Sequence, residues 1–112
     1  MTEPNPAATH RIAFSMLLPR ENIAEYRERH DRLWPEMRAA IAAQGGSNYS
    51  IFAAPELDRV FAYLEVEDLA RWQAGTGNAD VLRWWQYMAD IMPTNQDFSP
   101  VVMDLTEVFH QP

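Results

Sequence analysis

The sequence predicts an α+β fold in which a four-stranded antiparallel sheet carries helices, in the order βαββαβ. Three observations support this prediction. Apolar and polar residues alternate in four separate segments, a pattern typical of strands with one buried face. Two longer segments between them have the three-and-four spacing of amphipathic helices. The two central strands are joined by a short turn, which indicates an antiparallel hairpin.

The first strand and the first long helix open this order. Residues 11–18 alternate between apolar and polar side chains, and Pro19 ends the strand. We expect the helix to begin at Asn22 as its N-cap, with Glu25 three residues later as the capping-box partner. The glycine pair at 45–46 suits a left-handed C-cap, so we expect the helix to end there.

Pro35 lies inside this helical segment. Proline has no N–H to donate to the carbonyl of Asp31, and its ring crowds that turn, which costs roughly 3 kcal/mol in a regular helix. We therefore expect the helix to kink or split between Asp31 and Pro35. Such a break re-aims the turn that carries His30.

The predicted hairpin consists of residues 47–53 and 60–67, with a turn at residues 55–58. Phe61 and Tyr63 share one face of the later strand, and aliphatic residues occupy the other. Both faces of this strand are therefore apolar, although helices cover only one face of such a sheet. We expect a second copy of the chain to cover the open face, giving a homodimer packed sheet to sheet.

Two capped helices and a last strand complete the predicted fold, which has the ferredoxin-like plan. Asp68 is expected to cap a short helix, and Asn78 a longer one at residues 79–92. Residues 101–109 form the last strand. The predicted buried stripe of the longer helix consists of Val81, Trp85, Met88 and Met92. Trp84 lies about a hundred degrees around the helix from that stripe.

Composition limits the function classes. The 112 residues suit one domain, which we expect at residues 11–112 after a flexible extension at residues 1–10. The lack of cysteine excludes disulfides and thiolate chemistry. A net charge of −7 with only nine Lys and Arg argues against a nucleic-acid partner. No apolar run is long enough for a membrane span, and the first residues do not resemble a secretory signal, so we expect a cytoplasmic protein.

Several common sites are not supported by the sequence. It contains no Gly-x-Gly-x-x-Gly or Gly-Lys-Ser/Thr loop for nucleotide phosphates. Its three histidines are far apart, so we predict no metal site. No Gly-x-Ser-x-Gly elbow is present, although a Ser-His-Asp site stays possible.

His30 is the main candidate for proton transfer. Tyr26 and His30 are four residues apart and share a helix face with core residues. An imidazole titrates near neutral pH, which suits a general acid or base. The alternative is a histidine that is exposed or hydrogen-bonded to a neighbour such as Glu28 or Asp31.

Trp84 and Trp85 are the second candidate feature. Adjacent helix positions cannot both face one core line, so one ring lies toward an edge or a pocket. One interpretation places Trp85 in the core and Trp84 at the sheet edge or the dimer contact. The other is an aromatic platform on which a sugar stacks, with the phenols of Tyr26 and Tyr49 as added donors. Together with His30, these aromatic residues suit a small neutral polyol.

Several stretches of the sequence resemble the L-rhamnose mutarotase family. Residues 25–36 carry the pattern Glu-Tyr-x-x-Arg-His-Asp-x-x-Trp-Pro-Glu. Residues 83–95 carry Arg-Trp-Trp-x-Tyr-Met-Ala-Asp-Ile-Met-Pro-x-Asn. Residues 48–51, 99–100 and 107–112 also fit. The resemblance covers almost the whole chain after its N-terminal segment, and the two longer patterns are specific.

The resemblance implies a dimeric α+β barrel that interconverts the α and β anomers of L-rhamnose without a cofactor. It implies that His30 is the proton donor. The sugar-binding positions that it implies are Tyr26, Tyr49, Trp84 and Trp85. Mutarotation opens and recloses a hemiacetal ring, which needs an acid and a base but no redox centre. We expect His30 to be the acid at the ring oxygen, while Tyr26, another polar group or a water is the base.

The sequence departs from the family in the loop after Pro93, where Gln96 and Phe98 replace a proline and an asparagine or similar polar residue. The preferred sugar is therefore open between L-rhamnose and another deoxysugar such as L-fucose. A haem-degrading or quinone-forming monooxygenase on the same barrel is a second alternative, in which a helix histidine binds haem. A non-catalytic sugar-binding or dimerisation module is a third.

Overall fold

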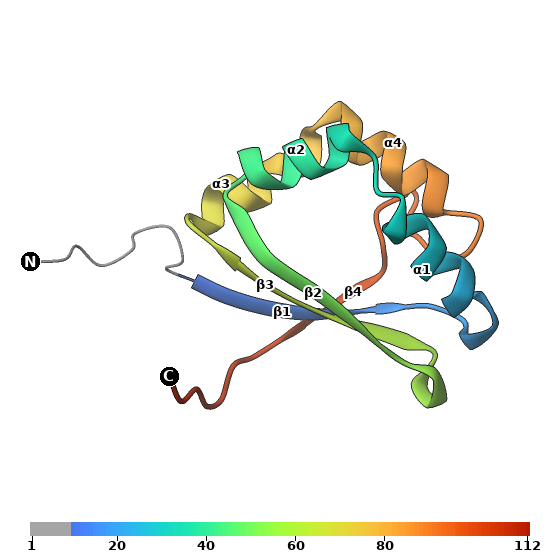
Figure 1. Ribbon diagram of the computed structural model, residues 1–112, viewed down its shortest axis with the longest axis horizontal. Coiled ribbons are helices and arrows are strands. Elements are labelled where there is room, and N and C mark those ends of the chain that lie inside the picture. Colours follow the sequence, from blue (N-terminus) through green and yellow to red (C-terminus); the bar gives the residue numbers. More distant parts are fainter. Residues whose placement is uncertain (1–9) are drawn as a thin grey trace, which may run out of the picture.

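The computed structural model describes residues 10–112, which form one antiparallel sheet with helices over one face (Figure 1). The strands are β1 (His10–Leu17), β2 (Gly46–Ala54), β3 (Arg59–Val66) and β4 (Val102–Leu105). The helices are α1 (Ile23–Asp31), α2 (Pro35–Ala43), α3 (Leu69–Ala74) and α4 (Ala79–Met88). Short 3-10 helices occupy Arg20–Asn22, Pro55–Leu57 and Gly75–Gly77. The strand order β2-β3-β1-β4 confirms the α+β, ferredoxin-like prediction.

The start of the described chain differs slightly from the expected boundary. Strand β1 begins at His10, one residue before the predicted domain start, and pairs with β3 from that residue onward. Residues 1–9, which make up most of the predicted extension, lie outside the described residues. Within residues 10–112, every helix is too short or too polar to span a membrane.

The predicted break at Pro35 is confirmed. Helix α1 ends at Asp31, and α2 starts at Pro35, where a missing N–H costs no helical hydrogen bond. Trp34 between them is extended, with φ −60° and ψ 140°. At the far end of α2, Gly45 has φ +85°, which confirms the left-handed conformation expected after this helix.

The capping box predicted at the start of α1 is wrong. A 3-10 turn leads into the helix, so Asn22 has φ −104° and ψ 5° and its side chain caps no backbone N–H. Its Nδ2 instead donates to the carbonyl of Ile91 at 2.8 Å. Glu25 accepts a hydrogen bond from Arg29 one turn later. Asn22 therefore ties the start of α1 to the segment after α4.

The two other predicted caps are confirmed. The carboxylate of Asp68 accepts a hydrogen bond from the backbone N–H of Arg71 in α3. Asn78 Oδ1 accepts hydrogen bonds from the first backbone N–H groups of α4. Helix α4 ends at Met88, earlier than predicted, because the next turn uses tighter i→i+3 bonds. Strand β4 is also shorter than predicted and ends at Leu105, where its pairing with β1 stops.

The core lies between the sheet and the helices. Its buried members are Met16, Leu18, Tyr26, Val60, Ala62, Trp84, Met88, Ile91 and Met92. Trp84 is only 6% exposed while Trp85 is half-buried, so the predicted stripe through Trp85 is wrong. The buried line of α4 passes through Val81, Trp84 and Met88, a spacing of three and four that is equally helical.

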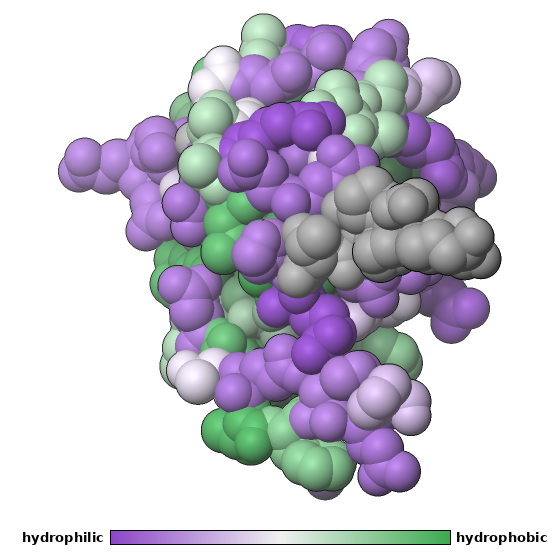
Figure 2. All heavy atoms as spheres, turned by 90° about the vertical axis from the view of Figure 1, so that its left-hand side faces the viewer, coloured by the Kyte–Doolittle hydropathy of each residue, from purple (hydrophilic) through white to green (hydrophobic). Residues whose placement is uncertain are grey.

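The opposite face of the sheet is uncovered within the described chain, and apolar side chains lie at its centre between charged ones such as Arg11 and Glu65. Strand pairing places Phe61 of β3 beside Phe52 of β2 and opposite Ser15 of β1, which in turn faces Met103 of β4. Phe52 is 68% exposed. Seen toward the end of the sheet at which β1 starts, the surface is mostly hydrophilic, and hydrophobic side chains show in patches along one flank and at the lower edge (Figure 2).

Candidate active site

A cavity of about 280 Å³ lies between the helices and the sheet face that they cover. Its wall includes every predicted site residue, which are Tyr26, His30, Tyr49, Trp84 and Trp85. These side chains come from α1, β2 and α4, so residues that are up to 59 positions apart in the chain meet at one place. A cavity of this size lies near the lower end of the range of small-molecule sites.

His30 is fixed in one tautomer by the backbone. Its Nδ1 lies 2.9 Å from the carbonyl oxygen of Tyr26, and a carbonyl can only accept, so Nδ1 carries the proton. Burial lowers the pKa of His30 below the usual 6.5, against smaller opposing effects of this hydrogen bond and of Asp31. The imidazole is therefore neutral at pH 7, with the lone pair on Nε2. In this state the imidazole can accept a proton at Nε2 and so acts as a base before it can act as an acid.

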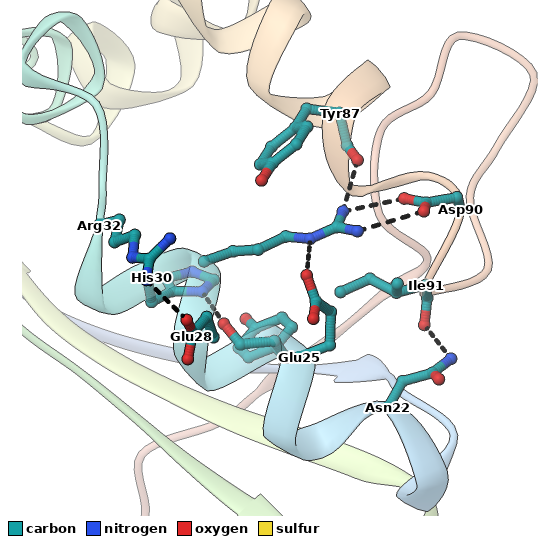
Figure 3. A network of polar contacts seen from close by, with 10 residues as sticks. Asn22, Glu25, Glu28, His30, Arg32, Tyr87, Asp90 and Ile91 are labelled. Atoms are coloured by element: carbon teal, nitrogen blue, oxygen red, sulfur yellow. Dashed lines mark hydrogen bonds and ion pairs between the residues drawn. The ribbon is translucent and has the colours of Figure 1, made fainter.

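The side-chain partners that we considered for His30 are engaged elsewhere or act only at a distance. Glu28 forms an ion pair with Arg32 at 3.0 Å, on the outside of α1 (Figure 3). The imidazole instead stacks on the ring of Tyr26 with the centroids 4.3 Å apart. Trp84 meets the imidazole edge-on at 5.4 Å. The histidine is thus held by aromatic packing and one backbone bond at the cavity wall.

Trp84 owes its position to the break between α1 and α2. Trp34, in the extended link before Pro35, packs edge-on against Trp84 with the ring centroids 5.1 Å apart. This contact favours the rotation of α4 that points Trp84 toward His30. Trp85, one position later, is half-buried and also lines the cavity.

Tyr26 and Tyr49 are protonated phenols. Burial raises the pKa of Tyr49 to about 12, and it raises the pKa of Tyr26 as well. Neither group is therefore a ready base at neutral pH. Both suit hydrogen bonding to sugar hydroxyls, and the option of Tyr26 as the catalytic base becomes the weaker one.

A β-bulge aims Tyr49 into the cavity. The pairing of β2 with β3 shifts by one residue between Ser47 and Ser50. Asn48 in the bulge has φ +49°, and its side-chain amide donates to Glu65 of β3 at 2.9 Å. The predicted placement of Tyr49 on the same face as Ile51 is confirmed, since both line the cavity.

Arg29 supports the site, although the sequence did not predict this role. Its side chain is only 10% exposed. The guanidinium donates to Glu25 at 2.8 Å, to the carbonyl of Tyr87 at 2.7 Å and to Asp90 at 2.9 Å (Figure 3). It therefore fastens α1 to the end of α4, one residue away from His30. The only signal in the sequence was its spacing of four residues from Glu25.

Gln44 is a second residue that the sequence did not reveal. It lines the cavity at the end of α2, and its Nε2 is buried without a hydrogen-bond partner in the described chain. The side chain fits over Gly75, where an added Cβ would lie 2.0 Å from Gln44 Cδ. A buried donor without a partner is costly, so this amide is a candidate for binding a ligand hydroxyl.

Comparisons with known proteins agree with this geometry. The family model described as L-rhamnose mutarotase matches residues 11–111. The L-rhamnose mutarotase of Bacillus subtilis is 47% identical over 100 residues, which cover 89% of this chain and 96% of that protein. The Listeria monocytogenes protein of the same name is 48% identical with the same coverage. The crystal structure of an L-rhamnose mutarotase from Formosa agariphila has a TM-score of 0.82 and 43% identity, and covers 93% of this chain and 100% of that one.

Proposed function

The chain belongs to the L-rhamnose mutarotase family, and we propose that it interconverts the α and β anomers of L-rhamnose with His30 as the proton carrier. It is thus an isomerase that acts on a carbohydrate. The observation that carries the assignment of His30 is a neutral imidazole, oriented by the Tyr26 carbonyl, in the wall of an aromatic cavity. The comparisons favour neither the monooxygenase nor the binding-module alternative.

The reaction needs one proton to leave the anomeric hydroxyl and one to reach the ring oxygen. In the proposed step, Nε2 of His30 takes the proton from O1. The C1–O5 bond breaks as the C1–O1 bond becomes a carbonyl, and the imidazolium gives its proton to O5. Both oxygens are bonded to C1, so one imidazole can serve both, first as base and then as the proton donor that the family resemblance implies.

Reclosure runs the same steps in reverse on the other carbonyl face. The open-chain sugar rotates about its C1–C2 bond before O5 attacks C1 again. Indole and phenol rings hold the sugar through its C–H faces and a few hydroxyls, which permits this rotation better than a dense hydrogen-bond cage. We assign that role to Trp84, Trp85, Tyr26 and Tyr49. No net oxidation occurs, so the reaction requires no cofactor.

The activity is tested by NMR exchange spectroscopy on equilibrated L-rhamnose. The wild-type protein should speed the exchange between the two anomeric signals, and His30→Ala should abolish this acceleration while circular dichroism shows an unchanged fold. An absence of acceleration with both L-rhamnose and L-fucose would refute the assignment. A wild-type protein that binds L-rhamnose without changing the exchange rate would favour the binding module.

We propose that the active form is a homodimer, a dimeric α+β barrel in which the uncovered sheet faces pack on each other. Support comes from the apolar side chains on that face, which include the exposed Phe52 and Met103 and the half-buried Phe61. Light scattering should give twice the chain mass of 12.9 kDa. We also propose that residues 11–112 are the single folded domain and that the protein acts in the cytoplasm, in keeping with its lack of cysteine.

A further inference from the structure

The loop between α4 and β4 is braced by its own hydrogen bonds. Thr94 pairs with Pro100 across its base. The backbone N–H of Asn95 donates to the Ser99 carbonyl at 2.8 Å, and the Asn95 side-chain amide donates to the Ser99 hydroxyl at 3.0 Å. Asp97 accepts hydrogen bonds from the N–H and the hydroxyl of Ser99. The loop is therefore closed around its tip.

Phe98 at this tip has a strained backbone. Its φ is +69°, in the left-handed region that bulky side chains rarely adopt. The other non-glycine residues with positive φ in the described chain are Asn48 and Asp58, whose types tolerate this conformation. Strain of this kind persists where the surroundings impose it, and it concentrates at functional sites. The braced loop thus holds a phenyl ring in a place that its backbone alone would not favour.

Phe98 lines the cavity at the end near β4, where it is 42% exposed. Pro100 and Val102 line the wall beside it in the chain. Gln44 and Gln73 line the other end, near the start of β2. Strand pairing separates the two ends. The starts of β1 and β2 both pair with Val66 of β3, so they lie at one end of the sheet, whereas β4 begins beside the end of β1. Figure 1 shows the same separation between α3 and the loop that enters β4.

We propose that Phe98 is a specificity-determining residue that packs against the C6 methyl end of the 6-deoxysugar and directs the sugar hydroxyls toward Gln44. This inference rests on the proposed function. A 6-deoxyhexose has one apolar end and hydroxyls elsewhere, which matches the polarity of the cavity from one end to the other. The 6-hydroxy counterpart, L-mannose, would place a hydroxyl against the phenyl ring and lose hydrogen bonds to water.

The test compares anomer exchange of L-rhamnose and L-mannose in four proteins. Phe98→Asn and Phe98→Gly remove the ring and relieve the backbone strain, since both residues accept positive φ. Phe98→Leu is the matched control, because it keeps an apolar side chain and the strain. We expect the ratio of kcat/KM for L-rhamnose over L-mannose to fall about ten-fold in the Asn and Gly variants and to stay within about three-fold of wild type in the Leu variant. The Asn and Gly variants should melt no earlier than wild type.

The outcomes separate this inference from the proposed function. If the wild-type protein accelerates neither sugar, the proposed function fails and this inference fails with it. If the wild type is active and the Asn and Gly variants keep its preference, only the role of Phe98 is refuted. A loss of preference in the Leu variant equal to that in the Asn variant would also contradict it, because apolar contact would then not be the cause. The Gly variant gives the answer if the Asn variant does not fold.

Discussion

The contact between Gln44 and Gly75 predicts that Gly75→Ala destabilises the wild-type protein but not a variant that lacks the Gln44 side chain. Gly75 has ordinary right-handed dihedrals, with φ −66° and ψ −10°. Alanine would therefore fit the backbone. It would stabilise the protein by about 0.4–1 kcal/mol, because it reduces the conformational entropy of the unfolded chain. In the native protein, however, the new Cβ would lie 2.0 Å from Gln44 Cδ and 2.6 Å from its Cγ. Ordinary contact begins at 3.4 Å, so the Gln44 side chain must move.

The expected magnitude follows from these opposing effects. Overpacking of this kind costs about 1–3 kcal/mol, so Gly75→Ala should destabilise the wild-type background by about that amount. In a Gln44→Ala background the clash is absent, and the same substitution should be neutral or stabilising. The coupling energy between positions 44 and 75 should then be about 1–3 kcal/mol. Gly75→Ala should also raise KM for L-rhamnose, because it displaces an amide from the cavity wall.

Urea unfolding of the four proteins, with a common m-value, measures this coupling. Anomer exchange at several sugar concentrations supplies KM. An equal effect of Gly75→Ala in both backgrounds would refute the reasoning, since it would mean that Gln44 does not occupy the space above Gly75. Destabilisation without a change in KM would leave the steric contact intact but would contradict a role of the Gln44 amide in binding.

Three further predictions concern the supports of the site and the uncovered face. Arg29→Gln should lower the anomer exchange rate several-fold, because it loosens α1 from α4. The control is Arg32→Gln, at a side chain that is 79% exposed, which should leave the exchange rate unchanged. Equal exchange rates in the two variants would contradict the role of Arg29. Trp84→Ala should lower the free energy of unfolding by about 3–5 kcal/mol, and Trp85→Ala should lower it clearly less, because Trp85 is only half-buried. Urea unfolding measures both values, and the reverse order would contradict the observed rotation of α4. Phe52→Glu should shift light scattering from dimer to monomer, and a mass that stays at the dimer value would count against the sheet-to-sheet contact.

Local signals in the sequence predicted most of the fold. Alternation defined the strands, and side chains with a strong local preference defined the helix boundaries at Pro35, Asp68 and Asn78. Each of these acts within one turn of its own position, so no distant partner is needed to predict it. The strand order then followed from the order of elements and the short hairpin.

The errors arose where a distant partner decides the outcome. Asn22 gives up its capping role because the carbonyl of Ile91 lies within reach. Trp84 rather than Trp85 faces the core because Trp34, fifty positions earlier, packs against it. The burial of Arg29 depends on Asp90 and on a backbone carbonyl of α4. Periodicity alone cannot distinguish a solvated arginine from one that joins two helices.

The candidate site was predicted as a set of residues but not as a geometry. Every proposed side chain lines the cavity, although their assignment came from the family resemblance and from residue types. The sequence did not reveal that the Tyr26 carbonyl fixes the tautomer of His30, nor that burial lowers its pKa. Those two features change the expected resting role of His30 from acid to base. The strained conformation of Phe98 was likewise invisible, because nothing in its neighbours requires a positive φ.

The central claim is that a neutral His30 starts the reaction by accepting the anomeric proton, and a pH–rate profile tests it most directly. Because burial lowers its pKa, His30 should be neutral, and kcat/KM for L-rhamnose maximal, at neutral pH and above. Activity should fall with decreasing pH through a midpoint below 6.5. A lowered pKa also means that the unfolded chain binds the His30 proton more readily than the folded protein, so the free energy of unfolding decreases as the pH falls through that midpoint. Circular dichroism must therefore show a folded protein at each pH. In His30→Gln, this fall of activity with decreasing pH should be absent once the spontaneous exchange rate is subtracted. A rate that rises as the pH falls below 6.5, or a profile unchanged in His30→Gln, would contradict the account.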